Sequence, residues 1–293
     1  MNKRESIYSK KSYIGDAILK FFIYFSAFAC VFVLGFIIFY ILSNGMKYIT
    51  IDLLTKPYSE NNEEMKGILP MIINTFYIII ITLIISVPIG ISAAIYMTQY
   101  AKQSRLLRLI RFTTEVLSGI PSIIFGLFGF IIFCGMFRIG TSILSGCLTM
   151  TLCILPTIIR TTEESLLSVP EFYKEGALAL GAGKFKVIMQ IVLPCALPGI
   201  ITSIILAIGR IVGESAALLY TSGMAYNMPN DIFSHIMHSG RTLTLHLFRI
   251  AKQADTSDSL GIAFAISAIL LILVFLINIM VTLPKRIIDK RMK

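Results

Sequence analysis

The chain has 293 residues, of which 14% are charged and 56% are hydrophobic. When its 20 Gly replace its 12 Tyr in the apolar set, the apolar share becomes about 59%, whereas soluble domains contain about 45–50%. One globular core cannot hide so many apolar side chains, which excludes a soluble enzyme, a disordered chain and a disulfide-framed protein. The formal net charge is +10, and its distribution along the chain is informative.

Six stretches are apolar and long enough to cross a bilayer, which takes about 20 residues in a helix. In chain order they are 21–42, 72–97, 116–137, 141–159, 198–220 and 261–283. The first stretch is too long for the core of a signal peptide and lacks a small-residue cleavage site, so we expect it to remain uncleaved. The pattern predicts an all-α integral membrane protein with six transmembrane helices.

The positions of Lys and Arg predict the orientation. With the N-terminus inside, eighteen of the 26 lie in inside segments, seven lie in outside loops, and Arg210 lies within the fifth stretch. Because basic residues concentrate on the cytoplasmic side, both termini are expected there. Topology and anionic lipid thus account for the positive charge, and no nucleic-acid partner is predicted.

Between the second and third stretches, Lys102 to Arg111 carries Arg at every third position with Leu and Ile between. This spacing fits either an amphipathic helix in the headgroup layer or plain flanking charge, and it predicts no specific role.

The cytoplasmic loop at about 161–197 carries the most specific pattern. Ser168 and Glu171 have capping-box spacing with a Pro between them, so a helix is expected to begin there and to end in a left-handed turn at Gly181. Lys184 to Leu193 predicts a second short helix. Two short helices at a glycine bend would form a rigid knob suited to docking on a soluble partner.

The same bend is not a phosphate-binding loop. Leu178 stands where such a loop needs Gly, and Phe185 stands where it needs Ser or Thr. The chain is therefore not expected to bind or hydrolyse ATP itself.

The loop resembles the EAA loop of ABC importer permeases. The positions that carry this resemblance are Glu175, Gly176, Ala177, Gly181, Ile191, Leu193 and Pro194. Gly176 replaces the usual second Ala of the motif, at some cost in helix propensity. The resemblance implies a coupling helix that sits in a cleft of an ATPase subunit, and the fold of a type I ABC importer transmembrane domain.

Other motifs resemble the phosphate-specific permeases, and the PstA-type subunit more than the PstC-type. They are Gly67 to Pro70, Gly119 to Gly129, Pro156 to Glu163, and Gly209 to Leu219. The expected division is 1–66 for the N-tail, first helix and outer loop, 67–283 for the transport domain, and 284–293 for a basic tail.

This second resemblance implies a permease subunit of an ATP-driven phosphate importer in a bacterial cell membrane. Its partners would be a PstC-type permease, a dimeric ATPase that uses ATP and Mg, and an extracytoplasmic phosphate-binding protein. The chain itself is expected to bind no cofactor and no metal, and to form half of the translocation pathway.

Arg210 is the thirteenth residue of the fifth stretch, which places it roughly 18 Å deep and near the midplane. A central Arg costs about 2.5–3.5 kcal/mol, so a function is expected of it. Glu214 is one turn further on the same face. Either the two residues pair inside the bundle, or Arg210 faces the pathway and its planar fork contacts phosphate while Glu214 holds or competes for it. We favour the second interpretation.

Arg160 follows the end of the fourth stretch at the cytoplasmic side. It is either an ordinary flanking residue or a second basic contact near the inner mouth of the pathway. The resemblance adds Thr161, Thr162 and Glu163 as residues that shape this mouth. Gly209 and Gly213 have the spacing of a close helix–helix contact.

Three histidines, His235, His238 and His246, lie in the last outer loop. Contact with solvent or with the binding protein is expected of them rather than metal binding, because no further ligand has a compelling spacing.

Other functions remain open in principle. The cargo could be another oxyanion or an amino acid, although two arginines favour an anion. A gradient-driven transporter would show inverted repeats and no docking loop. A membrane enzyme would need a catalytic cluster, and no HExxH or GxSxG motif occurs, nor any paired His within a span.

Overall fold

The computed structural model describes residues 14–58, 67–226, 228, 231–252 and 257–291. The start of the N-tail (1–13) and part of the first outer loop (59–66) lie outside the described residues. The long helices are α1 Ile14–Gly45, α3 Leu69–Ile95, α6 Ile143–Leu167, α9 Leu193–Gly213 and α13 Ser257–Arg291. The shorter helices are α2 Ile51–Thr55, α4 Arg105–Ser118, α5 Ser122–Gly129, α7 Glu171–Ala179, α8 Lys184–Val187, α10 Ala216–Thr221, α11 Ile232–Ile236 and α12 Leu243–Lys252.

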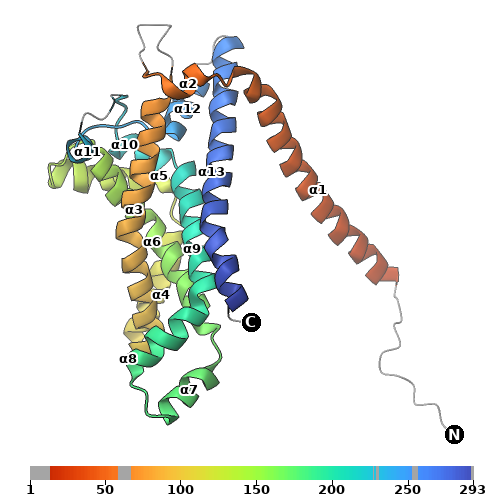
Figure 1. Cartoon of the computed structure of the whole chain (residues 1–293), viewed down its shortest axis with the longest axis vertical. Coiled ribbons are helices and arrows are strands. Elements are labelled where there is room, and N and C mark those ends of the chain that lie inside the picture. The colour runs from red at the N-terminus through yellow and green to blue at the C-terminus, as the bar shows by residue number, and fades with distance from the viewer. Residues whose placement is uncertain (1–13, 59–66, 227, 229–230, 253–256, 292–293) are drawn as a thin grey trace.

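Four of the long helices, α3, α6, α9 and α13, form a bundle with α7 beyond one end and α2 and α12 at the other (Figure 1). The core of the bundle is made of buried aliphatic side chains, which include Ile78, Met150, Ile154, Ile208 and Ile211. α3 approaches α6 closely because Gly90 has no side chain. A Cβ there would lie 2.6 Å from Cγ2 of Ile158.

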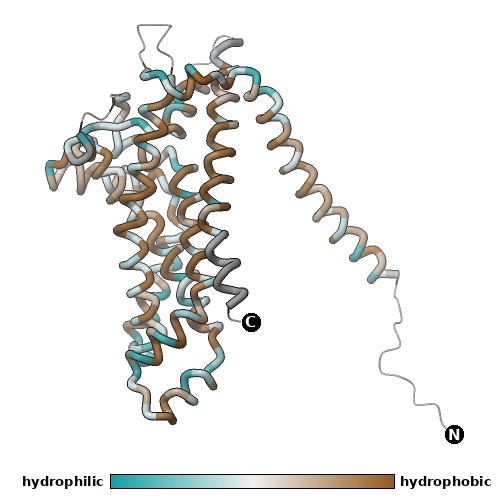
Figure 2. The backbone as a smooth tube through the Cα atoms, viewed as in Figure 1, coloured by the Kyte–Doolittle hydropathy of each residue, from teal (hydrophilic) through white to brown (hydrophobic). Residues whose placement is uncertain are grey.

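Helix α1 diverges from the bundle and touches it only near its own end (Figure 1). There the Tyr40 ring meets Phe264 of α13 edge-on at 5.6 Å, and Gly45 lies against the Phe264 backbone. Most of α1 is apolar (Figure 2). No residue of its apolar stretch is buried. Such a surface is stable in lipid but not in water.

Five helices in the described residues are long and apolar enough to cross a membrane, and there are six if α4 and α5 count as one bent span. This agrees with the predicted all-α membrane fold. The third predicted span, however, is not a straight helix over 116–137. The chain turns by 102° between α4 and α5, because Pro121 lacks an N–H group and restricts the residue before it.

Of the two interpretations left open for Lys102 to Arg111, the structure shows the helix: α4 begins at Arg105 and extends to Ser118. It begins after Ser104, whose Oγ accepts a hydrogen bond from the Leu107 N–H at 3.2 Å. One side of α4 faces α6, while Leu106, Leu109 and Phe112 are exposed.

The fourth and fifth spans also differ from the prediction. α6 continues past residue 159 to Leu167, because the first charged residue after an apolar run does not end a helix. The fifth begins earlier, as an unbroken helix from Lys184, and stops at Gly213 instead of reaching residue 220. A wider π-turn at Ile188–Val192 precedes Pro194 and accommodates the missing N–H.

Candidate functional site

Arg210 lies on α9 and points to α6. Its Nη1 donates to Oγ1 of Thr157 at 3.3 Å, and its side chain is partly buried. Cys153 lies one turn before Thr157 on α6. A hydroxyl is a neutral acceptor, so Arg210 keeps its full positive charge beside α6.

Glu214 does not share a helical face with Arg210, which corrects the predicted geometry. α9 ends at Gly213, and Glu214 is extended, with φ −81° and ψ 122°. Its Oε1 accepts a hydrogen bond from the Ala217 N–H at 3.2 Å at the start of α10. In the described part of the chain no ion pair joins Glu214 to Arg210, so the paired interpretation is wrong for this structure.

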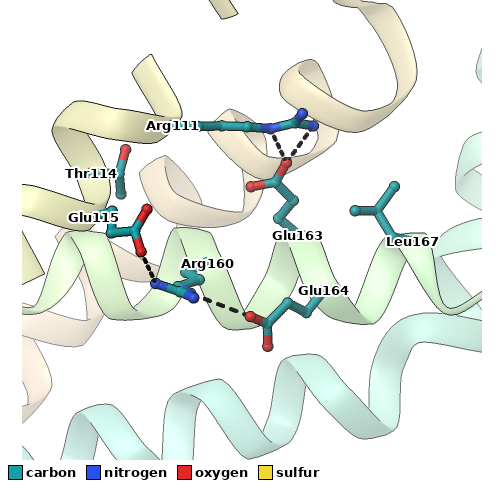
Figure 3. Close-up of a pocket in the computed structure, with 7 residues that line it drawn as sticks. All are labelled: Arg111, Thr114, Glu115, Arg160, Glu163, Glu164 and Leu167. Atoms are coloured by element: carbon teal, nitrogen blue, oxygen red, sulfur yellow. Dashed lines mark hydrogen bonds and ion pairs between the residues drawn. The ribbon is translucent and has the colours of Figure 1, made fainter. Parts of the chain in front are cut away.

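Arg160 lies within α6 rather than at its end. Its Nη1 is 3.6 Å from Oε1 of Glu115 on α4, and its Nε donates to Oε1 of Glu164 at 3.3 Å (Figure 3). More than half of each of these side chains is exposed. Arg160 is therefore a guanidinium shared by carboxylates from two helices.

Glu163 pairs with a different arginine. Both Nε and Nη2 of Arg111, on α4, lie 2.7 Å from its Oε1 (Figure 3). The Glu163 side chain is only 12% exposed, so this contact is tighter and drier than the contacts of Arg160. It fastens α4 to α6.

These charged groups surround a cavity of about 270 Å³ between α4 and α6. Its lining residues are Arg111, Thr114, Glu115, Arg160, Glu163, Glu164 and Leu167 (Figure 3). The two predicted threonines are absent from this lining. Thr162 is fully buried, with its hydroxyl 3.4 Å from that of Ser203 on α9. The Thr161 carbonyl accepts a hydrogen bond from Ser165 within α6.

The two predicted arginines border the same face of α6. Thr157, Arg160 and Glu164 follow at spacings of three and four residues, which places them on one side of a helix. Thr157 and Arg160 are separated by about 5 Å along the helix axis. Arg210, through Thr157, and Arg160 therefore form a short basic track that points toward the α7 end of the bundle.

The sequence predicted both arginines but not their partners. The Arg160–Glu164 spacing of four residues was a visible signal of pairing. Glu115 and Arg111 come from α4, whose packing on α6 no local pattern specifies, and Thr157 carries no signal of its own.

The predicted knob is present in part. α7 begins at Glu171 and the chain turns at Gly181, where φ is +84° and only Gly is unstrained. The capping box is not formed, since Ser168 donates to the Ser165 carbonyl and α7 has no side-chain cap. The predicted second short helix of the knob is not separate, because α8 runs unbroken into α9 and so forms the start of that long helix.

The predicted coupling residues therefore lie in two different elements, the helix α7 and the long helix that continues into α9. Glu175 and Gly176 are exposed on α7 and Ala177 is partly buried, as expected of a knob. Ile191, Leu193 and Pro194 instead lie within the long helix. Ile191 and Leu193 pack against a buried cluster that includes Leu166 of α6 and Ile200 of α9. The large exposed apolar side chains on and beside α7 are Phe172, Tyr173, Leu178, Leu180 and Phe185.

The predicted contact of Gly209 and Gly213 is not made within the described chain. A Cβ at either position would meet nothing within 4 Å. Close approach occurs instead at Gly90, Gly126 and Gly199.

Two of the three histidines are buried, which corrects their predicted exposure. His235 Nε2 donates to Oδ1 of Asn74 on α3 at 2.7 Å, and His246 Nδ1 accepts from Arg241 Nη1 at 3.3 Å. His238 is exposed. Among the described residues no group of three or more potential ligands could hold a metal ion.

Arg241 is the centre of this second cluster. It is 1% exposed, its Nε donates to the Met224 carbonyl at 3.0 Å, and its guanidinium lies over the rings of Tyr58 and Tyr226. Burial, aided by this charge, lowers the pKa of His246 to about 3. The cluster joins α12 to the loops at its end of the bundle and is structural in character.

Residues 86–293 match the model of the family described as binding-protein-dependent transport system inner membrane component. A probable ABC transporter permease, YqgI of Bacillus subtilis, is 35% identical over 82% of this chain and 84% of its own length. The phosphate transport system permease PstA of Haemophilus influenzae is 33% identical over 87% of this chain and 88% of its own length.

Solved structures show the same fold at lower identity. A bacterial alginate ABC transporter chain superposes with a TM-score of 0.66 at 15% identity, covering 94% of this chain and 98% of its own. A chain of the MetNI methionine ABC transporter superposes with a TM-score of 0.58 at 20% identity, and the match covers 77% of this chain and 94% of its own. The resemblance to PstA-type permeases is confirmed by the relatives, and the chain belongs to the family of binding-protein-dependent transport system inner membrane components.

Proposed function

We propose that this chain is the permease subunit of an ATP-driven phosphate importer and supplies half of its pathway. The observation that carries the proposal is the basic track of Arg210 and Arg160 along one face of α6. Guanidinium groups bind phosphate oxygens through paired hydrogen bonds, and Arg210 has a neutral partner that leaves its charge available. The names of relatives such as PstA support phosphate as the anion.

In this proposal the α7 end is cytoplasmic, and so are both termini. Phosphate arrives at the α12 end from an extracytoplasmic binding protein and crosses between this chain and a second permease of the PstC type. Arg210 receives it within the bundle, and Arg160 lies next toward the inner mouth. The excess of Lys and Arg in the segments at the α7 end supports this orientation.

A dimeric ATPase would bind at the α7 knob, with Glu175, Gly176 and Ala177 on the docked helix. The exposed Phe172, Leu180 and Phe185 give the knob an apolar surface that such a cleft can bury. Since α7 follows α6 after only a short turn, displacement of α7 moves the helix that carries the basic track. ATP and Mg would be bound by the ATPase and not by this chain.

Radiolabelled phosphate uptake tests the proposal in cells that lack this gene and are complemented with the wild-type gene. Arsenate and sulfate serve as competitors. Restored uptake that arsenate inhibits and sulfate does not is the expected result, because arsenate shares the charge and the protonation of phosphate. Wild-type levels of the protein without restored phosphate uptake would refute phosphate as cargo, and inhibition by sulfate would indicate a broader oxyanion site.

A further inference from the structure

The ion pairs around the α4–α6 cavity are of two kinds. Arg111 holds Glu163 through two N–H groups at 2.7 Å, with side chains 37% and 12% exposed. Arg160 meets its carboxylates at 3.3 and 3.6 Å, with all side chains between 55% and 68% exposed. Exposed pairs with long contacts contribute little and break readily, whereas the tight, shielded pair persists.

Arg160 has room and spare donors for another acceptor. Its contacts with carboxylates use Nε and Nη1, so within the described structure Nη2 is not committed to a protein carboxylate. The cavity beside it measures about 270 Å³. An oxyanion that enters this space reaches a guanidinium whose present partners are loosely held (Figure 3).

The same cavity contains more carboxylates than arginines. Glu115, Glu163 and Glu164 line it together with Arg111 and Arg160. Glu163 is occupied by Arg111, which leaves Glu115 and Glu164 as the groups that compete for Arg160. Carboxylate and phosphate bind a guanidinium in the same way, so the competition is direct.

We infer that Glu115 and Glu164 are exchangeable counter-ions that expel the transported oxyanion from Arg160. The anion displaces them on arrival, and their return to the guanidinium releases the anion toward the α7 end. The Arg111–Glu163 pair acts as a positioning contact that keeps α4, and hence Glu115, beside Arg160. The inference rests on the proposed function, because it requires an anion to leave by this route.

If the inference holds, removing the carboxylates of Glu115 and Glu164 should make uptake more sensitive to phosphate on the inner side. Without them Arg160 holds the oxyanion longer, and phosphate on the inner side rebinds more readily. The complete importer is reconstituted in vesicles, and ATP-driven phosphate uptake is measured while the phosphate concentration inside is raised. In a Glu115→Gln, Glu164→Gln double variant, the internal concentration that halves uptake is expected to fall about fivefold, which is the upper end of the strength of one exposed ion pair. The external concentration for half-maximal uptake should stay unchanged.

Two control variants accompany the test. Asp52→Asn removes a carboxylate that is 69% exposed and also paired at i,i+4, with Lys56, but at the opposite end of the bundle. It should retain wild-type sensitivity to internal phosphate. Glu115→Asp keeps the negative charge and should retain most of that sensitivity.

A double variant with wild-type sensitivity to internal phosphate would overturn the exchange. A loss of uptake rate without any change in this sensitivity would also overturn it, since that result indicates a merely structural contact. If wild-type vesicles accumulate no phosphate, the proposed function itself fails and the exchange falls with it.

Discussion

Arg210 donates a hydrogen bond to the hydroxyl of Thr157, a neutral group that does not compensate the guanidinium charge. A carboxylate partner would cancel the local field and compete with any anion, whereas a hydroxyl does neither. Glu214, the carboxylate nearest in sequence, is instead committed to the Ala217 N–H. The position of Arg210 could be predicted from sequence, but its partner could not, because the break after Gly213 changes which groups face one another.

His246 is the residue whose protonation the structure restricts most clearly. Its Nδ1 faces Arg241, which can only donate, so the ring must stay neutral to accept that hydrogen bond. Burial lowers its pKa to about 3, and the charges of Arg241 and Arg249 contribute. The unfolded chain takes up a proton below about pH 6.5, while the folded chain does not.

The contribution of this group to the free energy of unfolding is therefore complete above about pH 6.5 and is lost as the pH falls toward 3, by about 1.4 kcal/mol per pH unit. The melting temperature of the purified protein should fall between pH 7 and pH 5. The His246→Gln variant keeps an acceptor for Arg241 and does not titrate, so its melting temperature should fall less than that of the wild type over this pH range. His238→Gln, at an exposed position, should behave like wild type. Identical slopes in all three proteins would contradict the account.

Helix packing in the bundle depends on where glycines allow contact. Gly90 on α3 would clash with Ile158 if it carried a Cβ, whereas Gly209 on α9 has open space around it. The sequence pointed to Gly209 and Gly213 from their spacing alone. Spacing identifies which glycines share a face, but it does not identify which face meets a neighbour.

The same substitution at the two positions tests this contact. Gly90→Ala forces α3 away from α6 and is expected to cost about 1–3 kcal/mol, partly offset by the better helix propensity of Ala. Gly209→Ala should be neutral or slightly stabilising. Melting temperatures of the two variants provide the comparison, and equal values would show that Gly90 is not a tight contact.

The α7 knob is the element on which coupling depends in this account. Gly181 has a φ of +84°, which Pro cannot adopt because its ring fixes φ near −65°. A Gly181→Pro, Glu175→Arg double variant should therefore abolish uptake and co-purification of the ATPase while reaching normal membrane levels. Wild-type uptake by this variant would refute the docking role.

At the level of elements, the apolar spans and the left-handed turn were predictable, because they follow from composition and from glycine chemistry. The breaks were not. The chain bends by 102° before α5 and stops α9 at Gly213, and both breaks fall inside stretches that the composition predicts as single spans. The partners of Arg160 and Glu163 depend on that bend, since α4 reaches α6 only because the chain turns there.

The whole molecule is a helical bundle with one long helix held apart from it. α1 has no buried residue in its apolar stretch, and the basic track lies on a face of α6 rather than in an enclosed channel. Both features suit a chain that forms half of a pathway in a membrane assembly. The assembly, and not the isolated chain, is the unit in which transport can be measured.

The most direct test of the central claim is ATP-driven phosphate accumulation in vesicles containing the complete importer with wild-type, Arg210→Lys or Arg210→Gln permease. The account predicts accumulation by the wild type and a loss of at least about tenfold in Arg210→Gln, because the charge and both paired donors are removed. Arg210→Lys should be intermediate, since Lys keeps the charge but not the planar fork. Accumulation by Arg210→Gln at the wild-type rate would contradict the claim that Arg210 contacts the transported anion.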